Sequence, residues 1–294
     1  MPASSSSAVP ALVFLVQSAD QPGLVARISS FFHERGFNIV HLEQHADPVS
    51  SRLFLRIALD QRGLRSSRAE LTEAFGALAD ALDLTWSAHF ADHTQRVALL
   101  VTKASHCLYD LLVRWKEGEL PCDIPLIIGN HPDLEPVANA FRVPFHCLPV
   151  TKATKPQQEA EIDALLRKNH IDLVVLARYM QILTADFTDR WTGRIINIHH
   201  AFLPAFQGAR PYHRAYERGV KLIGATAHYV IAALDEGPII EQDVVRVTHE
   251  DAPQSLIRIG RDVERVVLAR AVQAHLEHRI VVDGHRTVVF GRGS

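Results

Sequence analysis

Hydrophobic and polar positions alternate in strand-like and helix-like runs over residues 11–90. Leu24, Ile28, Phe31 and Phe32 recur at the spacing of one helix face, and the runs on either side alternate as half-buried strands do. The pattern predicts a strand, a helix, two strands, a second helix and a closing strand at residues 11–17, 21–36, 38–46, 52–59, 68–82 and 84–90. This βαββαβ order is typical of a ferredoxin-like domain, which we place at residues 10–90.

The pattern changes after the polar segment HFADHTQR. Short, continuous apolar runs now alternate with helical patterns; the runs include RVALLVT, CDIPLIIGN, IDLVVLARY and GRIINIHH. Such runs indicate strands that are buried on both faces, so we predict a Rossmann-like α/β domain at residues 95–294, with helices on both faces of a mainly parallel sheet. LIGATAHYV and PIIEQDVVRV read as further strands, and RIVVDGHRTVVF reads as a hairpin with Asp-Gly in its turn.

Charge and cysteine content narrow the class of protein. The 294 residues include 31 Lys and Arg against 33 Asp and Glu, so the chain has no overall basic field for a nucleic acid, and we expect a small-molecule partner. Cys107, Cys122 and Cys147 form no C-x-x-C pair, which favours a reducing compartment and buried thiols. No signal peptide or membrane-spanning stretch is expected, so we predict a cytoplasmic protein without a membrane partner.

Candidate chemistry gathers around one predicted strand end and one loop. In INIHH, alternation places Asn197 and His199 on one side of the strand and turns His200 to the other. The loop LDEGP carries Asp235 between the next two strands. An amide and an imidazolium can donate to a developing oxyanion, and a carboxylate can orient or deprotonate the attacking group. No Ser or Cys nucleophile accompanies them, so water or an amine would attack directly.

Each of these residues also has a structural interpretation when it is taken alone. Asp235 could form a turn, Asn197 could cap a strand end, and His199 could be a hydrogen-bonded core residue. No H-E-x-x-H helix or Cys/His spacing predicts a metal, so we expect none, although His213 and His228 leave a metal site open. The combination of Asn197, His199 and Asp235 at the carboxyl edge of one sheet nevertheless favours a functional site.

The segment INIHHAFLPAFQGARPYHRAYERGVKLIGATAHYV with LDEGPII resembles the folate-dependent formyl transferase and hydrolase superfamily. The resemblance implies Asn197, His199 and Asp235 as the catalytic residues. With IIGNHPDL, VPFHCLPVTKATKPQQE and LARYMQIL, the chain is similar to formyltetrahydrofolate deformylases from about Val13 to Phe290. This similarity implies hydrolysis of 10-formyltetrahydrofolate to formate and tetrahydrofolate, serving one-carbon and purine metabolism, with the folate as substrate and no cofactor.

The same resemblance implies where the folate binds. The pterin would lie in a slot formed by the backbone around Met180, Gln181, Ile182 and Leu183 and by the loop leading to Asp235, and further substrate contacts would come from Gly208 and His228. The slot would follow a strand that ends near Tyr179. A buried helix start is the alternative interpretation of YMQIL.

The first domain, with SADQPGLVARIS and GFNIV, resembles an ACT domain. ACT domains commonly pair edge to edge and bind small amino acids, which implies a homo-oligomer and an effector contact at Gly23, Leu24 and Asn38. Assembly alone is the alternative role for this domain. For the second domain, formyl transfer to an amine is an alternative, but the turn VTKASHCL has no glycine with which to cradle an acceptor's phosphate. A folate or amino-acid sensor without turnover is a further alternative.

Overall fold

The elements that the hydrophobic pattern predicts form two units in the computed structural model, which describes residues 12–60, 67–204 and 211–291. One unit comprises the described residues up to His93 together with His278–Asp283 and the described residues from Val288 onward. The other comprises Thr94–Glu277 and Gly284–Thr287. We describe each unit by itself.

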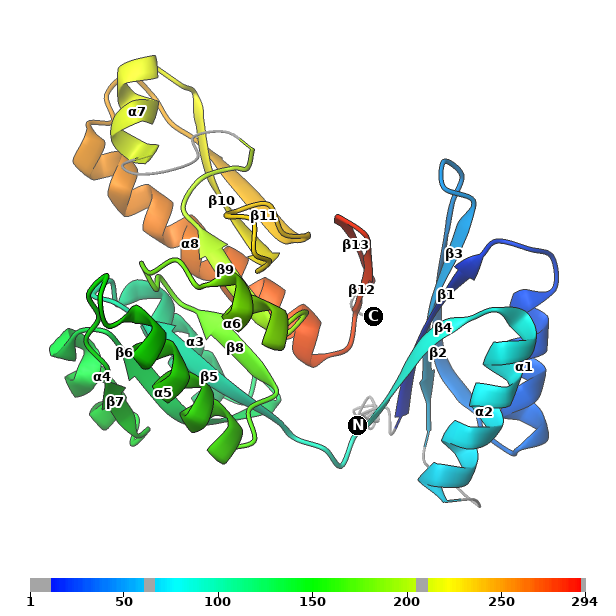
Figure 1. Cartoon of the computed structure of the whole chain (residues 1–294). Helices are drawn as coiled ribbons and strands as arrows, with labels where there is room; N and C mark the ends of the chain where they lie inside the picture. The colour runs from blue at the N-terminus through cyan, green and yellow to red at the C-terminus, as the bar shows by residue number, and fades with distance from the viewer. Residues whose placement is uncertain (1–11, 61–66, 205–210, 292–294) are drawn as a thin grey trace, which may run out of the picture. The chain divides into compact units, whose positions relative to one another are not determined.

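The first unit is the predicted ferredoxin-like fold, with two helices on one face of a four-stranded antiparallel sheet of order β2-β3-β1-β4 (Figure 1). Its elements are β1 Leu12–Ala19, α1 Leu24–Glu34, β2 Ile39–Asp47, β3 Arg52–Leu59, α2 Arg68–Leu82 and β4 Thr85–Phe90. The α2 helix begins at a capping box, in which the Ser67 side chain accepts from the Glu70 N–H and Glu70 accepts from the Ser67 N–H.

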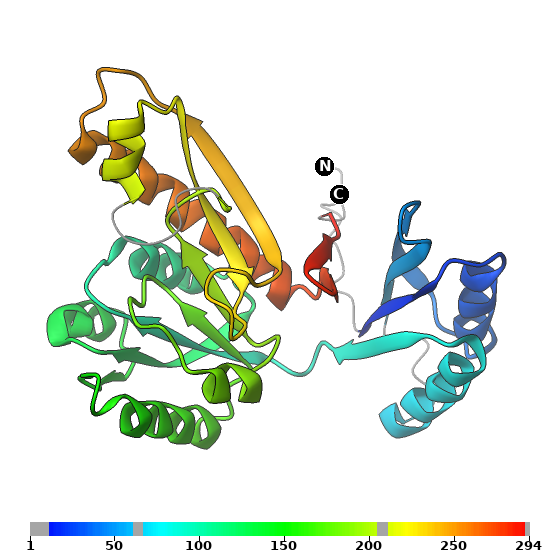
Figure 2. The same ribbon diagram turned by 45° about the horizontal axis from the view of Figure 1, so that its top comes forward.

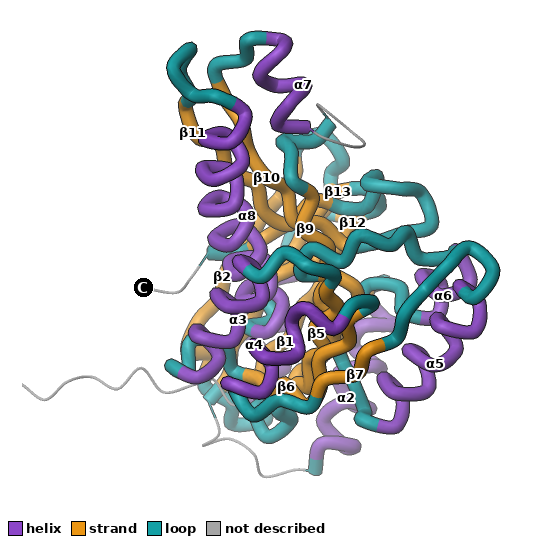
Figure 3. Tube along the Cα trace, turned by 90° about the vertical axis from the view of Figure 1, so that its left-hand side faces the viewer, coloured by secondary structure: helices purple, strands orange, loops and turns teal. Residues whose placement is uncertain are grey.

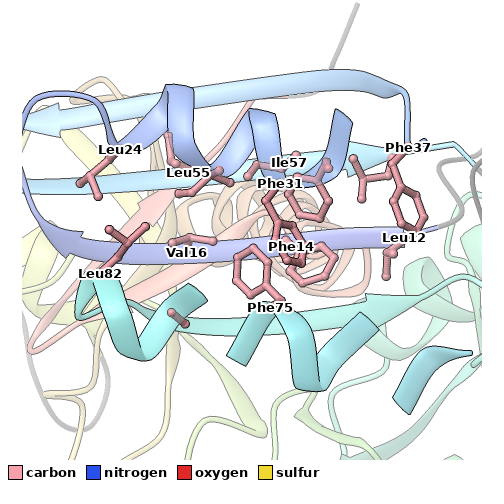
Figure 4. Packing of buried hydrophobic residues seen from close by; sticks show 14 of the residues in the cluster. Leu12, Phe14, Val16, Leu24, Phe31, Phe37, Leu55, Ile57, Phe75 and Leu82 are labelled. Carbon is pink, nitrogen blue, oxygen red and sulfur yellow. The ribbon is translucent and has the colours of Figure 1, made fainter. Parts of the chain in front are cut away.

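Apolar side chains of both helices and the central strands form the core of this unit (Figure 4). Phe14 from β1 lies at its centre, 4.6 Å from the ring of Phe75 and 5.0 Å from that of Phe32 between ring centroids. Alternation along the strands sends the neighbouring side chains to the opposite sheet face. There Phe54 packs with Val281 and Phe290 from the end of the chain.

That packing differs from the division expected at the C-terminus. The sequence analysis places residues 95–294 in one domain, whereas His278–Asp283 and the segment from Val288 belong to the first unit. The reason is the apolar face of the four-stranded sheet, which Val281 and Phe290 help to bury. The predicted hairpin itself is present, with β12 Ile280–Asp283, β13 Arg286–Val289 and a turn at Gly284.

The second unit holds a seven-stranded sheet of order β11-β10-β9-β8-β5-β6-β7. Five neighbouring strands are parallel and β10 runs antiparallel to both β9 and β11, which confirms the mainly parallel sheet. Its elements are β5 Gln95–Val101, α3 His106–Lys116, β6 Cys122–Gly129, a 3-10 helix Pro132–Leu134, α4 Glu135–Ala140, β7 Phe145–Cys147, α5 Lys155–Lys168, β8 Leu173–Leu176, α6 Ala185–Arg190, β9 Ile195–His199, α7 Pro211–Arg218, β10 Leu222–Tyr229, β11 Ile239–Arg246 and α8 Pro253–Leu276.

Helices cover both faces of this sheet. The α5 and α6 helices lie on one face, where Ile162, Leu166 and Phe187 pack on the strands, and α3 and α8 lie on the other (Figures 1 and 3). The long α8 runs along β10 and β11 (Figure 2). Cys107 and Cys122 are buried, but Cys147 is exposed, so the expectation of a buried thiol is wrong there, at the end of the edge strand β7. No helix within the described ranges is both long and apolar enough to span a bilayer.

Candidate active site

Strand β9 carries Asn197 and His199 at the carboxyl end of the parallel strands. Its remaining residues are isoleucines that are buried in the unit, so the polar side chains stand out from an apolar strand. The antiparallel neighbour β10 pairs His228 with Asn197 and Thr226 with His199. Strand register therefore brings a third polar side chain, that of His228, beside Asn197 and His199.

Asp235 approaches this strand from the loop that follows β10. Its backbone has a φ of 58°, in the left-handed region, and a Cβ on Gly237 would overlap the carbonyl oxygen of Tyr229. The turn thus needs a glycine beside the end of β10 in order to fold back. As a result, one Asp235 carboxylate oxygen lies 3.2 Å from His199 Nδ1 and the other lies 3.7 Å from His228 Nε2.

The hydrogen bonds of His228 orient the Asn197 amide. His228 Nδ1 lies 2.9 Å from the carbonyl oxygen of Tyr229, and a carbonyl can only accept, so Nδ1 carries a hydrogen. In the neutral ring, Nε2 then accepts from the Asn197 amide nitrogen at 3.3 Å. The amide N–H groups of Asn197 therefore face the site, and one of them stays available for a substrate oxygen. The predicted contact of His228 with the substrate stays a prediction.

Asp235 is held in its ionised form. The adjacent rings of His199 and then His228 lower the pKa of the Asp235 carboxyl well below its ordinary value, against the opposing effect of burial. His199, which is 5 % exposed, has its other nitrogen, Nε2, buried without a hydrogen-bond partner among the described residues. The ionised Asp235 carboxylate thus contacts Nδ1 of His199, and Nε2 of the same ring can act on a bound molecule.

These groups line a cavity of about 560 Å³. The loop Met180–Leu183 lines it as the resemblance implies, and Met180 and Ile182 are 55 % and 59 % exposed. YMQIL is therefore a loop and not a buried helix start, since α6 begins only at Ala185. Strand β8 ends at Leu176, three residues before the predicted end.

Hydrogen bonds to neighbouring segments hold both ends of this loop. The Met180 N–H donates to Thr102 Oγ1 at 2.9 Å, and the Thr184 N–H donates to Glu159 Oε1 at 3.0 Å. Glu159 belongs to α5 and is only 4 % exposed. The loop backbone is therefore pre-positioned at the carboxyl end of β8, where open α/β sheets bind ligands.

His200 lies where the sequence analysis did not place it. Strand β9 ends at His199, so alternation no longer applies to the next residue, and the His200 ring stacks on the His199 ring with centroids 5.4 Å apart. It lines the same cavity, and the expectation that it turns to the other face is wrong. Burial first, then the charge of Arg178, lowers the pKa of His200 to about 4, so its ring is neutral at pH 7.

A second group of charged residues, which the sequence did not predict, lines the same cavity. Glu264 of α8 is 1 % exposed; one carboxylate oxygen accepts from the Tyr212 hydroxyl at 2.7 Å, and the other lies 2.7 Å from His106 Nε2 and 3.3 Å from Arg178 Nε. Burial would raise the pKa of Glu264, but these partners outweigh it and lower that pKa. A carboxylate on the apolar face of α8 was the signal that sequence reasoning could have used.

His106, Cys107 and Glu264 each offer a potential metal-ligand atom, and these atoms lie within 4.8 Å of one another. Burial and the charge of Glu264 raise the pKa of the Cys107 thiol, so it stays protonated, while Glu264 already has three polar partners. A cation would also meet the charge of Arg178. We therefore do not assign a metal to this group.

The remaining predicted residues are outside this cavity or outside the described residues. Gly208 lies outside the described ranges. In the first unit, Gly23 precedes α1 with a φ of 87°, Leu24 is buried in the core, and Asn38 donates to Asp60 at 3.4 Å. An effector contact at these three residues stays a prediction.

The geometry defines an α/β enzyme domain built for attack on a small carbonyl group, joined to a ferredoxin-like domain. The family description "Formyl transferase" matches residues 95–272, and "ACT domain" matches residues 12–76. The class of protein is therefore a formyl transferase fold with an ACT domain before it.

Individual relatives narrow this class. A formyltetrahydrofolate deformylase of Synechocystis sp. is 59 % identical over 94 % of this chain and 97 % of its own length, and one of Bacillus subtilis is 49 % identical over 94 % and 92 %. A crystal structure of a formyltetrahydrofolate deformylase from Pseudomonas syringae pv. tomato has a TM-score of 0.94 and 42 % identity, covering 98 % of this chain and 96 % of that one. The chain belongs to the formyltetrahydrofolate deformylase family.

Proposed function

We propose that this chain hydrolyses 10-formyltetrahydrofolate to formate and tetrahydrofolate, with the folate as substrate and without a cofactor. The ionised Asp235 beside His199 carries this proposal, because it leaves His199 Nε2 directed into the cavity next to the Asn197 amide. The family relationship supports the same reaction. Formate and tetrahydrofolate would then enter one-carbon and purine metabolism.

The three side chains divide the reaction between them. Asp235 orients a water molecule and takes its proton as the water oxygen bonds to the formyl carbon. Asn197 and protonated His199 donate hydrogen bonds to the formyl oxygen as negative charge develops there. The bond from the formyl carbon to the folate nitrogen then breaks, and His199 gives a proton to that nitrogen. The ionised Asp235 stabilises His199 as a cation before this transfer.

The folate would bind along Met180–Leu183 and the loop before Asp235, where exposed apolar side chains adjoin the site. Gln181 lines the same wall. We further propose that Gly208 and His228 contribute substrate contacts and that Gly23, Leu24 and Asn38 hold an amino-acid effector. We also propose that the protein forms a homo-oligomer in the cytoplasm.

Formate release without an amine tests the reaction. The full-length protein should release formate from 10-formyltetrahydrofolate in buffer that contains no amine, and Asp235→Asn should still bind the folate but release no formate. Asp189→Asn, an exposed aspartate on α6, is the matched control and should behave as the wild type.

Other outcomes separate the alternatives. Release that occurs only after an amine is added would identify a formyl transferase. Folate binding without release under either condition would identify a sensor. Release by Asp235→Asn at the wild-type rate would disprove the role of that carboxylate.

A further inference from the structure

Arg178 enters the cavity from the end of β8 in a constrained backbone conformation. Its φ of 64° lies in the left-handed region, which a residue with a long side chain rarely adopts. The side chain is 16 % exposed and lines the cavity. Such conformations persist where the surrounding structure holds a side chain in place for a task.

Part of the Arg178 guanidinium lacks hydrogen-bond partners. Nε and Nη1 are buried, and neither makes a hydrogen bond within the described residues, although Nε is ion-paired with Glu264. Nε lies 3.3 Å from Glu264, but that carboxylate is shared with His106 and Tyr212. Buried donors without acceptors are unfavourable, and their presence in a cavity indicates that a ligand supplies the acceptors.

Charge in the group around Glu264 also favours an anion. The group includes two guanidinium side chains, those of Arg178 and the more exposed Arg261, against the single carboxylate of Glu264. The other carboxylate that lines the cavity, Asp235, faces His199 and His228. The other titratable side chains beside this group are His106, His200, Tyr212 and His213. Tyr212 donates to Glu264, and the imidazoles can donate to an anion. A bound monoanion would balance the charges.

Arg178 acts close to the reacting groups. Its charge contributes to the lowered pKa of His200, after the larger effect of burial, and the His200 ring stacks on that of His199. The neutral His200 ring therefore contacts His199 and is also affected by the charge of Arg178. An anion that forms beside His199 can reach Arg178 within the same cavity.

We propose that Arg178 forms a subsite for formate, the product anion, beside Glu264 in this cavity. A planar guanidinium matches a planar carboxylate through paired N–H donors, and formate is small enough to lie beside Glu264 without displacing it. In the reaction the formyl carbon gains the water oxygen and loses the folate nitrogen; one water proton goes to Asp235, the nitrogen takes its proton from His199, and the remaining water proton is lost to solvent, so formate leaves as a monoanion. The subsite would hold it until release and make formate a product inhibitor.

The identity of this anion rests on the proposed hydrolysis, but its binding can be measured without turnover. The full-length protein is titrated with ¹³C-labelled formate and followed by NMR line broadening, while sodium chloride keeps the ionic strength constant. Three heavy atoms limit affinity, so we expect a Kd of about 1 mM or weaker. Arg178→Gln should weaken binding at least tenfold, and Arg178→Lys should lie between, because it keeps the charge and loses the fork.

Two further variants separate binding from structure. Glu264→Gln removes the competing negative charge and should bind formate more tightly than the wild type, a change of sign that a structural role would not produce. Arg167→Gln, an exposed arginine of α5 paired with Asp163, is the matched control and should bind as the wild type. If Arg178→Gln fails to fold, the double variant Arg178→Gln/Glu264→Gln restores charge balance and should also bind at least tenfold more weakly.

Circular dichroism and thermal unfolding establish that each variant is folded. Unchanged formate affinity in folded Arg178→Gln, or in the double variant, would overturn the subsite, as would the absence of saturable binding by the wild type. Weaker binding by Glu264→Gln would also count against it. Hydrolysis without such binding would leave the proposed function intact, and Arg178-dependent binding without hydrolysis would leave only the subsite.

Discussion

At the residue scale, Asn197 and His199 lie on one strand but differ in what holds them. Asn197 lies within hydrogen-bond distance of His228 Nε2, whereas His199 contacts an ionised carboxylate. The Asn197 amide can therefore donate only a hydrogen bond, whereas His199 can also donate a proton. This difference assigns separate tasks to two side chains that alternation places together.

Removing either donor should slow the chemical step more than it weakens folate binding. Asn197→Ala and His199→Ala should each lower kcat by about a hundredfold or more, because a donor to a developing oxyanion acts mainly in the transition state. Steady-state kinetics with 10-formyltetrahydrofolate and equilibrium binding of tetrahydrofolate provide the measurement. Asn139→Ala, an exposed position of α4, is the control. A raised KM at unchanged kcat would contradict these roles.

His200 offers a test of charge at the same scale. Because burial and Arg178 lower its pKa to about 4, His200 keeps the same neutral form from pH 5 to pH 9. His200→Gln should lower the rate, since the ring stacks on His199, but the midpoints of the pH–rate profile should stay unchanged. The profile of kcat/KM over this range is the measurement. A shifted or missing limb would show that His200 titrates during turnover.

At the element scale, one glycine decides how α7 meets α8. A Cβ on Gly260 of α8 would overlap the hydroxyl end of Tyr212, the residue of α7 that donates to Glu264. Gly76 of α2 offers a contrast, since its added Cβ would meet only Trp86 at 3.9 Å. The two positions share helical geometry and differ in packing.

Alanine at these two glycines should therefore have opposite effects. Gly76→Ala should stabilise the protein by about 0.5–1 kcal/mol through helix propensity. Gly260→Ala should destabilise it by about 1–3 kcal/mol, because overpacking outweighs that gain. Urea unfolding measures both. If Gly260→Ala also stabilises, Tyr212 moves freely, and the buried group around Glu264 is less constrained than its contacts indicate.

At the scale of the whole molecule, the end of the chain belongs with its beginning. Val281 and Phe290 are buried with Phe54 on the sheet of the first unit. Cutting the chain at residue 90 would thus remove the partner of an apolar segment that remains. Exposed apolar surface of this kind promotes self-association.

Two fragments test this organisation. Residues 94–277 should fold into a sheet domain that stays dispersed, whereas residues 91–294 should self-associate because Val281 and Phe290 are uncovered. Light scattering and circular dichroism compare them with the full chain. The proposed amino-acid effector binds in the first unit, which both fragments lack. Both fragments should therefore lose any effect of an amino acid on hydrolysis. Identical behaviour of the two fragments would assign the C-terminal segment no part in the first unit.

Much of this organisation is readable from the sequence because it depends on local periodicity. Period-two and helical spacing predict βαββαβ and then a mainly parallel sheet, and strand alternation groups Asn197 with His199. The loop LDEGP between two predicted strands adds Asp235, and resemblance adds the loop Met180–Leu183. These conclusions concern residues near one another in sequence or motifs that are retained as a block.

Other features depend on contacts between segments far apart in the chain. Periodicity ends with its strand, so it could not place His200, one residue beyond β9. Arg178 and Glu264 are 86 positions apart, and only the packing of α8 against the sheet brings them to 3.3 Å. Likewise, only tertiary burial seats Val281 against Phe54. The sequence alone determined the elements and the candidate trio of Asn197, His199 and Asp235, whereas the tertiary structure decided the charged group around Glu264 and the place of the C-terminal segment, because long-range burial and charge pairing leave no local period to read.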